Sequence, residues 1–145
     1  MIRAELNQSQ LRGGQRLPAR LVARTLREVE RELRLKKDVA FSVAFVSPAQ
    51  MRKLNRAWRG KDRVTDVLSF ELAGEQTFGE VLISYDQARR QARERGAGAR
   101  EEVLFLLVHG ILHLFGYDHE RSKDAKRMFP LQAKILTRLG IDPRL

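Results

Sequence analysis

The residues best able to do chemistry in this sequence are its three histidines, which all fall in the segment HGILHLFGYDHE at 109–120. His109 and His113 are four residues apart, and His119 follows six residues later. Four residues turn an α-helix by about 400°, so the first two rings share one face, about 6 Å apart along the axis, and can close on one ion. Three neutral imidazoles bind zinc and leave a fourth coordination position open. The spacing therefore predicts one zinc ion held by His109, His113 and His119.

One position separates this segment from the zinc peptidases. In their pattern HExxHxxGxxH the residue after the first histidine is a glutamate that acts as general base, and here it is Gly110. A ligand set without that base suits cleavage of an anionic phosphodiester, because neutralising the charge of the transition state is a larger part of that reaction than generating a strong nucleophile. A zinc-dependent peptidase of unusual type, with its base supplied by Glu80 or Asp66, stays open, although Asp66 is more simply a turn residue.

The histidine pair lies on a segment whose apolar pattern predicts a buried helix. From Glu101 to Phe115 the side chains are apolar nearly all round, and the two histidines are the only polar ones after the first turn. Gly116 is expected to end the helix in a left-handed conformation and reverse the chain, which returns His119 to the pair. Asp118 and Glu120 either orient a ligand imidazole or belong to the turn.

The rest of the chain alternates between strand and helix patterns. Strands are predicted at 2–6, 39–46, 67–72 and 80–85, and helices at 18–35, 48–58, 86–95, 101–115 and 122–139. Asp86 is the expected cap of the third helix. The pattern predicts an α+β fold with a small mixed sheet of about four strands and about five helices, and residues 1–145 are expected to form one domain.

The composition excludes some kinds of site and indicates an anionic partner. Without cysteine, thiolate ligands, disulfides and cysteine nucleophiles are excluded. The net charge is +10, and residues 52–63 hold six basic side chains against one aspartate. Such a cluster suggests nucleic acid, although a well-solvated surface would look similar. The N-terminus lacks an apolar signal segment and no apolar run is long enough for a bilayer, so we expect a cytoplasmic protein without membrane contact.

Two further segments, together with the histidine motif, resemble a known protein family. With HGILHLFGYDH, the segments LNRAWRGKDRVTDVLSFEL at 54–72 and GEVLIS at 79–84 resemble the YbeY family of bacterial metal-dependent endoribonucleases, which mature ribosomal RNA. The resemblance spans most of the chain. It implies that the three histidines are the zinc ligands and that Arg59 lies in the active-site cleft. Glu80 stands where the family usually has an aspartate, which keeps the charge on a longer side chain.

The predicted function is a metal-dependent, single-strand-specific endoribonuclease that hydrolyses RNA phosphodiester bonds in ribosomal RNA processing and ribosome quality control. One zinc ion, His109 and Arg59 would carry the reaction, since the planar guanidinium matches phosphate. The residues assigned to RNA binding are Arg56, Arg59, Lys61 and Arg63. The expected partners are precursor ribosomal RNA and the ribosome, not DNA.

Some alternatives stay open in the sequence. The attacking group is either water or the RNA 2′-hydroxyl. A non-catalytic RNA-binding or ribosome-binding factor would use the same basic face and a structural zinc. Trp58 and Phe70 could stack on RNA bases, although core packing also explains Phe70.

Overall fold

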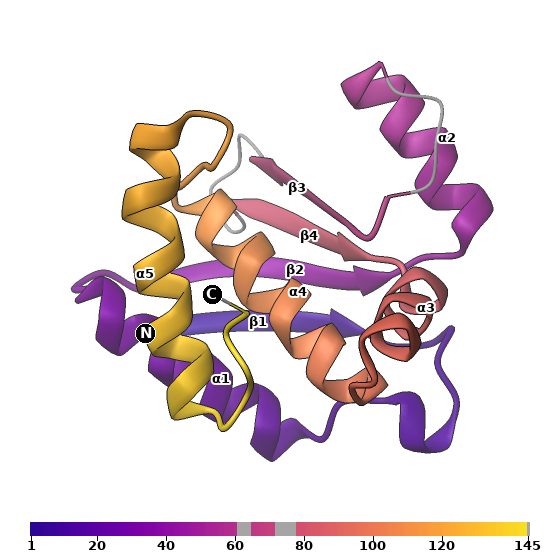
Figure 1. The fold of residues 1–145 in the computed structure, drawn as a ribbon, viewed down its shortest axis with the longest axis horizontal. Coiled ribbons are helices and arrows are strands. Elements are labelled where there is room, and N and C mark those ends of the chain that lie inside the picture. The colour runs from indigo at the N-terminus through magenta and orange to yellow at the C-terminus, as the bar shows by residue number, and fades with distance from the viewer. Residues whose placement is uncertain (61–64, 72–77, 145) are drawn as a thin grey trace.

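A four-stranded sheet with helices against it forms the described part of the chain (Figure 1). The computed structural model describes residues 1–60, 65–71 and 78–144. Its elements are β1 (Ile2–Asn7), the 3-10 helix η1 (Gly13–Gln15), α1 (Ala19–Leu33), β2 (Val39–Phe45), α2 (Pro48–Arg59), β3 (Val67–Glu71), β4 (Gly79–Ile83), α3 (Tyr85–Arg95), α4 (Ala99–Leu114) and α5 (Ser122–Arg138). The α+β fold with four strands and five α-helices confirms the predicted fold class.

The sheet is mixed and has the strand order β1-β2-β4-β3. β1 pairs with β2 and β2 with β4 in parallel, and β3 pairs with β4 in the antiparallel direction. The two paired strands are consecutive in the chain, and their connection at 72–77, including Leu72 at the end of the predicted strand, lies outside the described residues. β3 is therefore an edge strand, and its outer backbone edge is available to other groups.

The two faces of the sheet bury different helices, because successive side chains of a strand point to opposite faces. On one face, Val81 and Ile83 of β4 join a core shared with α1, α4 and α5. On the other face, Leu68 and Leu82 pack against Met51 of α2. Figure 1 shows α4 and α5 lying across the near face, whereas α2 lies beyond the β3 edge. The edge strand β3 thus separates α2 from α4.

Helix α4 is apolar nearly all round because it packs against β3, β4, α3 and α5. It begins two residues before the predicted start and ends at Leu114. Gly116 then adopts a φ of +92°, and the Tyr117 N–H donates to the Leu112 carbonyl at 3.1 Å. The predicted glycine turn is confirmed. Within the described ranges, no helix is long and apolar enough to cross a membrane.

The expected cap of the third helix is wrong. Ser84, not Asp86, caps α3, with its hydroxyl accepting a hydrogen bond from the Gln87 N–H at 3.3 Å. The strand ends earlier than predicted, at Ile83, because Ser84 is already the N-cap of α3. Asp86 lies in the first turn, where the helix dipole favours a carboxylate, and forms an ion pair with Arg89 at 3.7 Å.

Candidate active site

The three histidines converge at the end of α4 and the turn that follows it. The Nε2 atoms of His113 and His109 lie 3.1 Å apart. Ligand nitrogens of all three histidines lie within 4.8 Å of one another. Zinc with nitrogen ligands at about 2.0–2.1 Å in a tetrahedron needs them about 3.3 Å apart, so the closest pair already fits such an ion. Of the three rings, that of His119 is exposed and stacks on Phe129.

His109 is oriented by Gln132 of α5. Its Nδ1 lies 2.8 Å from the Gln132 Oε1, and Gln132 is only 4% exposed. A carboxamide oxygen can only accept, so Nδ1 carries the proton and the Nε2 lone pair faces the other histidines. A second group that fixes a ligand imidazole in this way is typical of metal centres. The sequence prediction missed Gln132, although it interrupts a buried stripe of α5 that contains Met128, Ile135 and Leu136.

Burial keeps the helix pair of imidazoles neutral. Burial lowers the pKa of His109 below its ordinary value of 6.5, against the hydrogen bond to Gln132, which raises it. Burial, followed by the charges of the two neighbouring histidines, lowers the pKa of His113 to about 4. A metal ligand must be unprotonated. Both residues are therefore ready to bind a cation at neutral pH.

A buried carboxylate lies behind the histidines. Glu102 is fully buried, accepts a hydrogen bond from the Gln91 Nε2 at 2.9 Å and is paired with Arg144. The Arg144 guanidinium carbon lies 3.8 Å from the centre of the Phe105 ring, which in turn stacks on His109 with ring centres 6.2 Å apart. This layer of polar and aromatic contacts limits how far the His109 ring can tilt.

The close packing at Gly110 explains why no glutamate follows the first histidine. A Cβ atom at this position would lie 2.7 Å from the Val81 Cγ1 and 3.2 Å from the Ser69 Oγ. The Ser69 hydroxyl also donates to the Gly110 carbonyl at 2.8 Å. The position therefore faces the sheet at close range and has no room for the base of a zinc peptidase.

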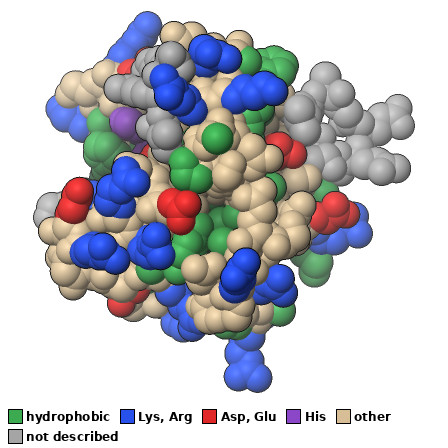
Figure 2. Space-filling view, turned by 90° about the vertical axis from the view of Figure 1, so that its right-hand side faces the viewer, with side chains coloured by type: hydrophobic (Ala, Val, Ile, Leu, Met, Phe, Trp, Pro, Cys, Tyr) green, Lys and Arg blue, Asp and Glu red, His purple; other side chains and the backbone are tan. Residues whose placement is uncertain are grey.

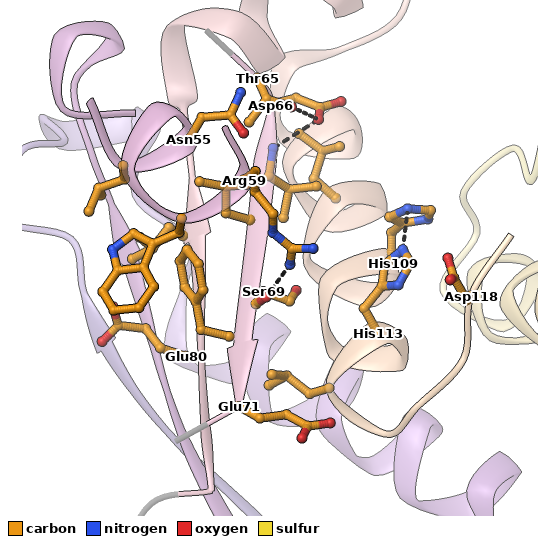
Figure 3. Close-up of a pocket in the computed structure, with 18 of the residues that line it drawn as sticks. Asn55, Arg59, Thr65, Asp66, Ser69, Glu71, Glu80, His109, His113 and Asp118 are labelled. Atoms are coloured by element: carbon orange, nitrogen blue, oxygen red, sulfur yellow. Dashed lines mark hydrogen bonds between the residues drawn. The ribbon is translucent and has the colours of Figure 1, made fainter. Parts of the chain in front are cut away.

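Arg59 reaches the histidine side of the molecule across the edge strand. It is the last residue of α2, and its Nη2 donates to the Ser69 carbonyl of β3 at 2.8 Å. Its guanidinium carbon lies 5.8 Å from the centre of the Phe70 ring. Figure 3 shows the guanidinium on the side of β3 that faces His109 and His113. Arg59 and the three histidines line one cleft of about 1400 Å³.

The other residues predicted for the site fall in different places. Asp66 lines the cleft, but its carboxylate accepts from the Val67 N–H at 2.8 Å and from Gln91, as a turn residue would. Glu80 lies on the α2 side of the sheet, away from His109 and His113 in Figure 3. Asp118 lies beside the histidines, and a hydrogen bond from the His119 N–H lowers its pKa.

The basic residues predicted to bind RNA are only partly placed. Arg56 is exposed on α2, whereas Lys61 and Arg63 lie outside the described residues. Figure 2 shows basic side chains around the point where a histidine reaches the surface. The cleft itself differs from this surface. Among its described lining residues, Arg59 is the single arginine or lysine, and the carboxylates are Asp66, Glu71, Glu80, Asp118 and Glu120.

Comparison with known proteins assigns the fold and the histidine motif to a family. The family described as endoribonuclease YbeY matches residues 4–140. The chain belongs to the endoribonuclease YbeY family. Within this family, endoribonuclease YbeY of Sulfurihydrogenibium sp. is 51% identical over 108 residues, which cover 70% of this chain and 71% of the relative. That of Aquifex aeolicus is 44% identical over 108 residues, with 71% and 72% covered.

A solved structure has a fold similar to that of this chain. The solution structure of TM1509 from Thermotoga maritima is similar to this chain with a TM-score of 0.62 and 35% sequence identity. The similarity covers 96% of this chain and 89% of that one. The family match over residues 4–140 confirms the resemblance noted in the histidine motif and the upstream segments.

Proposed function

We propose that this chain cleaves single-stranded RNA with one zinc ion held by His109, His113 and His119 and with Arg59 as the second cationic group. Membership of an endoribonuclease family means that the reaction is RNA phosphodiester cleavage in ribosomal RNA processing. Precursor ribosomal RNA and the ribosome are the proposed partners, which places the reaction in the cytoplasm. The observation that carries the proposal is the single cleft that the three histidines share with Arg59.

The charges of the cleft support a bound cation. One guanidinium against five carboxylates would repel an RNA backbone from the described lining. Neutral imidazoles leave the full charge of a divalent ion available, so a metal at the histidines makes this end of the cleft attractive to phosphate. When bound there, zinc would supply Lewis-acid chemistry toward a phosphate oxygen.

Arg59 is placed to stabilise charge on the phosphate. Its hydrogen bond to the Ser69 carbonyl and its contact with Phe70 hold the guanidinium at the edge of β3. A donor fixed before the reaction stabilises charge that develops in the transition state without the cost of reorganisation. The planar fork also matches phosphate oxygens better than an ammonium group does.

A peptidase is the alternative that the geometry disfavours. The place of its usual base is Gly110, which packs against the sheet. Glu80 faces α2 and not the histidines, and the carboxylate of Asp66 is engaged by a backbone N–H and Gln91. No base is thus left at the two positions from which a peptidase was expected to take one.

Single-turnover cleavage of a labelled single-stranded RNA tests the proposal. Arg59→Ala and Arg59→Lys should keep the metal content and the melting temperature of the parent, because the side chain is exposed. Both should cleave about 10²–10³-fold more slowly, as expected when one preorganised donor is lost. Arg27→Ala, which removes an exposed arginine of α1 outside the cleft lining, is the matched control. Cleavage by Arg59→Ala at the parent rate would rule out this role, and loss of metal would make the residue structural.

A further inference from the structure

An aromatic side chain is exposed at the rim of the proposed active site. Trp58 is 70% exposed, and among the described residues the other exposed large hydrophobic side chain is Met1. A single exposed aromatic residue needs no explanation in itself. Trp58, however, lines the same cleft as His109, His113 and Arg59, and an exposed aromatic ring in that position requires an explanation.

The indole of Trp58 is held in place with its surface free. Trp58 lies in the last turn of α2, and the residue that caps this helix, Gly60, has a φ of +68°. Its ring meets the Phe70 ring edge-on, with centres 5.9 Å apart and planes inclined by 60°. The same Phe70 ring supports the Arg59 guanidinium. With 70% of Trp58 exposed, much of the indole is uncovered, and the indole and the Arg59 guanidinium both contact the Phe70 ring.

We propose that Trp58 is a stacking platform for a base of the RNA whose phosphate binds between the histidines and Arg59. The inference rests on the proposed function and adds a specificity-determining residue to it. Proteins bind single strands by combining cations that follow the backbone with aromatic rings on which unstacked bases lie. Arg59, Lys53 and Arg56 are exposed on the same helix, α2, and supply the cations.

The platform also gives a physical reason for preferring single strands. Bases inside a duplex are stacked on each other and offer no free face to an indole. A single strand can turn one base onto the Trp58 ring while the adjacent phosphate stays at Arg59. Trp58 therefore discriminates by whether a base is free to stack, and not by which base it is.

The experiment uses the fact that Trp58 is the single tryptophan of the chain. The metal-loaded protein is titrated with a short single-stranded RNA carrying 2′-O-methyl groups, with an abasic strand of equal phosphate count, and with a duplex. Binding is measured by anisotropy of labelled RNA, and stacking by quenching of the indole emission. Only the strand with free bases should quench. Trp58→Leu should weaken its binding by about 5- to 100-fold, Trp58→Tyr should weaken it less, and neither should alter binding of the abasic strand.

Salt dependence separates stacking from charge. Trp58→Leu should leave the slope of log K against log salt unchanged, whereas Arg56→Gln should lower its magnitude by about 0.7 and weaken both strands alike. If the strand with bases binds without quenching and Trp58→Leu binds it like the parent, the platform is overturned while the proposed function stands. If the parent neither binds nor cleaves RNA, both are overturned. Should Trp58→Leu fail to fold, quenching of the parent and the Trp58→Tyr affinity decide.

Discussion

At the scale of single residues, the proposed metal site depends on the direction of the Nε2 lone pair of His109. A neutral imidazole can carry its proton on either ring nitrogen, so His109 and His113 could each offer either nitrogen to a metal if their tautomers were free to change. The Gln132 oxygen removes that freedom at His109 by accepting from Nδ1 at 2.8 Å. The site is thus completed from α5, an element that contributes no ligand of its own.

Replacing Gln132 by methionine should weaken metal binding without unfolding the protein. Methionine has nearly the same shape but no acceptor for the Nδ1 proton, so the ligand orientation is lost while the packing stays. A loss of about 10- to 100-fold in zinc affinity is expected, measured by competition with a chromophoric chelator. Gln132→Glu keeps an acceptor oxygen and should retain most of the affinity. Equal affinity in Gln132→Met and the parent would show that the contact does not orient the ligand.

The histidine cluster could be predicted from the sequence, whereas the groups that support it could not. The spacing of His109, His113 and His119 and the turn at Gly116 are local features that a single segment specifies. The contact between His109 and Gln132 joins residues 23 positions apart. It follows only from how α5 packs on α4. Gln132, as a polar residue in the buried stripe of α5, could have been noticed in the sequence, but the sequence does not show that it contacts His109.

At the scale of elements, the approach of α4 to the sheet fixes where the histidines lie. Gly110 allows the helix backbone to come close to Val81 and Ser69. The Ser69 hydroxyl bonds the Gly110 carbonyl, while the Ser69 carbonyl accepts from Arg59. One residue of β3 thus connects the helix that carries two histidines to the helix that carries the arginine.

Gly110→Ala should destabilise the protein although alanine favours a helix. The gain in helix propensity is about 1 kcal/mol. A new methyl group 2.7 Å from a buried valine carbon must shift the helix or the strand, and such overpacking costs about 1–3 kcal/mol. Urea unfolding should therefore give a lower free energy of unfolding. Gly14→Ala, where an added Cβ meets nothing within 4 Å, is the control and should be nearly neutral. A Gly110→Ala protein more stable than the parent would contradict the close approach.

The elements themselves were largely predictable, but the sheet order was not. Apolar periodicity located all four strands and five helices within a few residues, because it reports which face of each segment is buried. The placement of β4 between β2 and β3 depends on pairing between distant segments, which periodicity does not encode. The error at Asp86 is a local one, since Ser84, two residues earlier, accepts the hydrogen bond from the Gln87 N–H and caps the helix. That residues 1–145 form one domain stays a prediction.

At the scale of the whole molecule, charge is distributed unevenly. The chain carries a net charge of +10, yet among the charged side chains of the described cleft lining five are carboxylates and one is an arginine. RNA would therefore be attracted to the surface by arginine and lysine and held in the cleft only near Arg59 and a metal ion. This separation predicts that binding and cleavage respond differently to substitutions.

Arg56→Gln should weaken RNA binding more than it slows the chemical step. The residue is exposed on α2 but does not line the cleft. Its loss should reduce the salt dependence of binding by about one phosphate contact, for RNA of any sequence. Cleavage measured with saturating enzyme should stay near the parent rate. A sequence-selective loss of affinity, or a slower step at saturation, would place Arg56 in base recognition or in the reaction instead.

The central claim is that one metal ion, held by the three histidines, is required for RNA cleavage. Its most direct test is to remove metal from the purified protein with a chelator and to add zinc back in known amounts while measuring single-turnover cleavage. The rate should be lost on removal and should rise with added zinc until about one equivalent per chain, as three imidazoles for one ion require. His113→Ala should not recover. Full cleavage by the metal-depleted protein, or by His113→Ala, would contradict the claim.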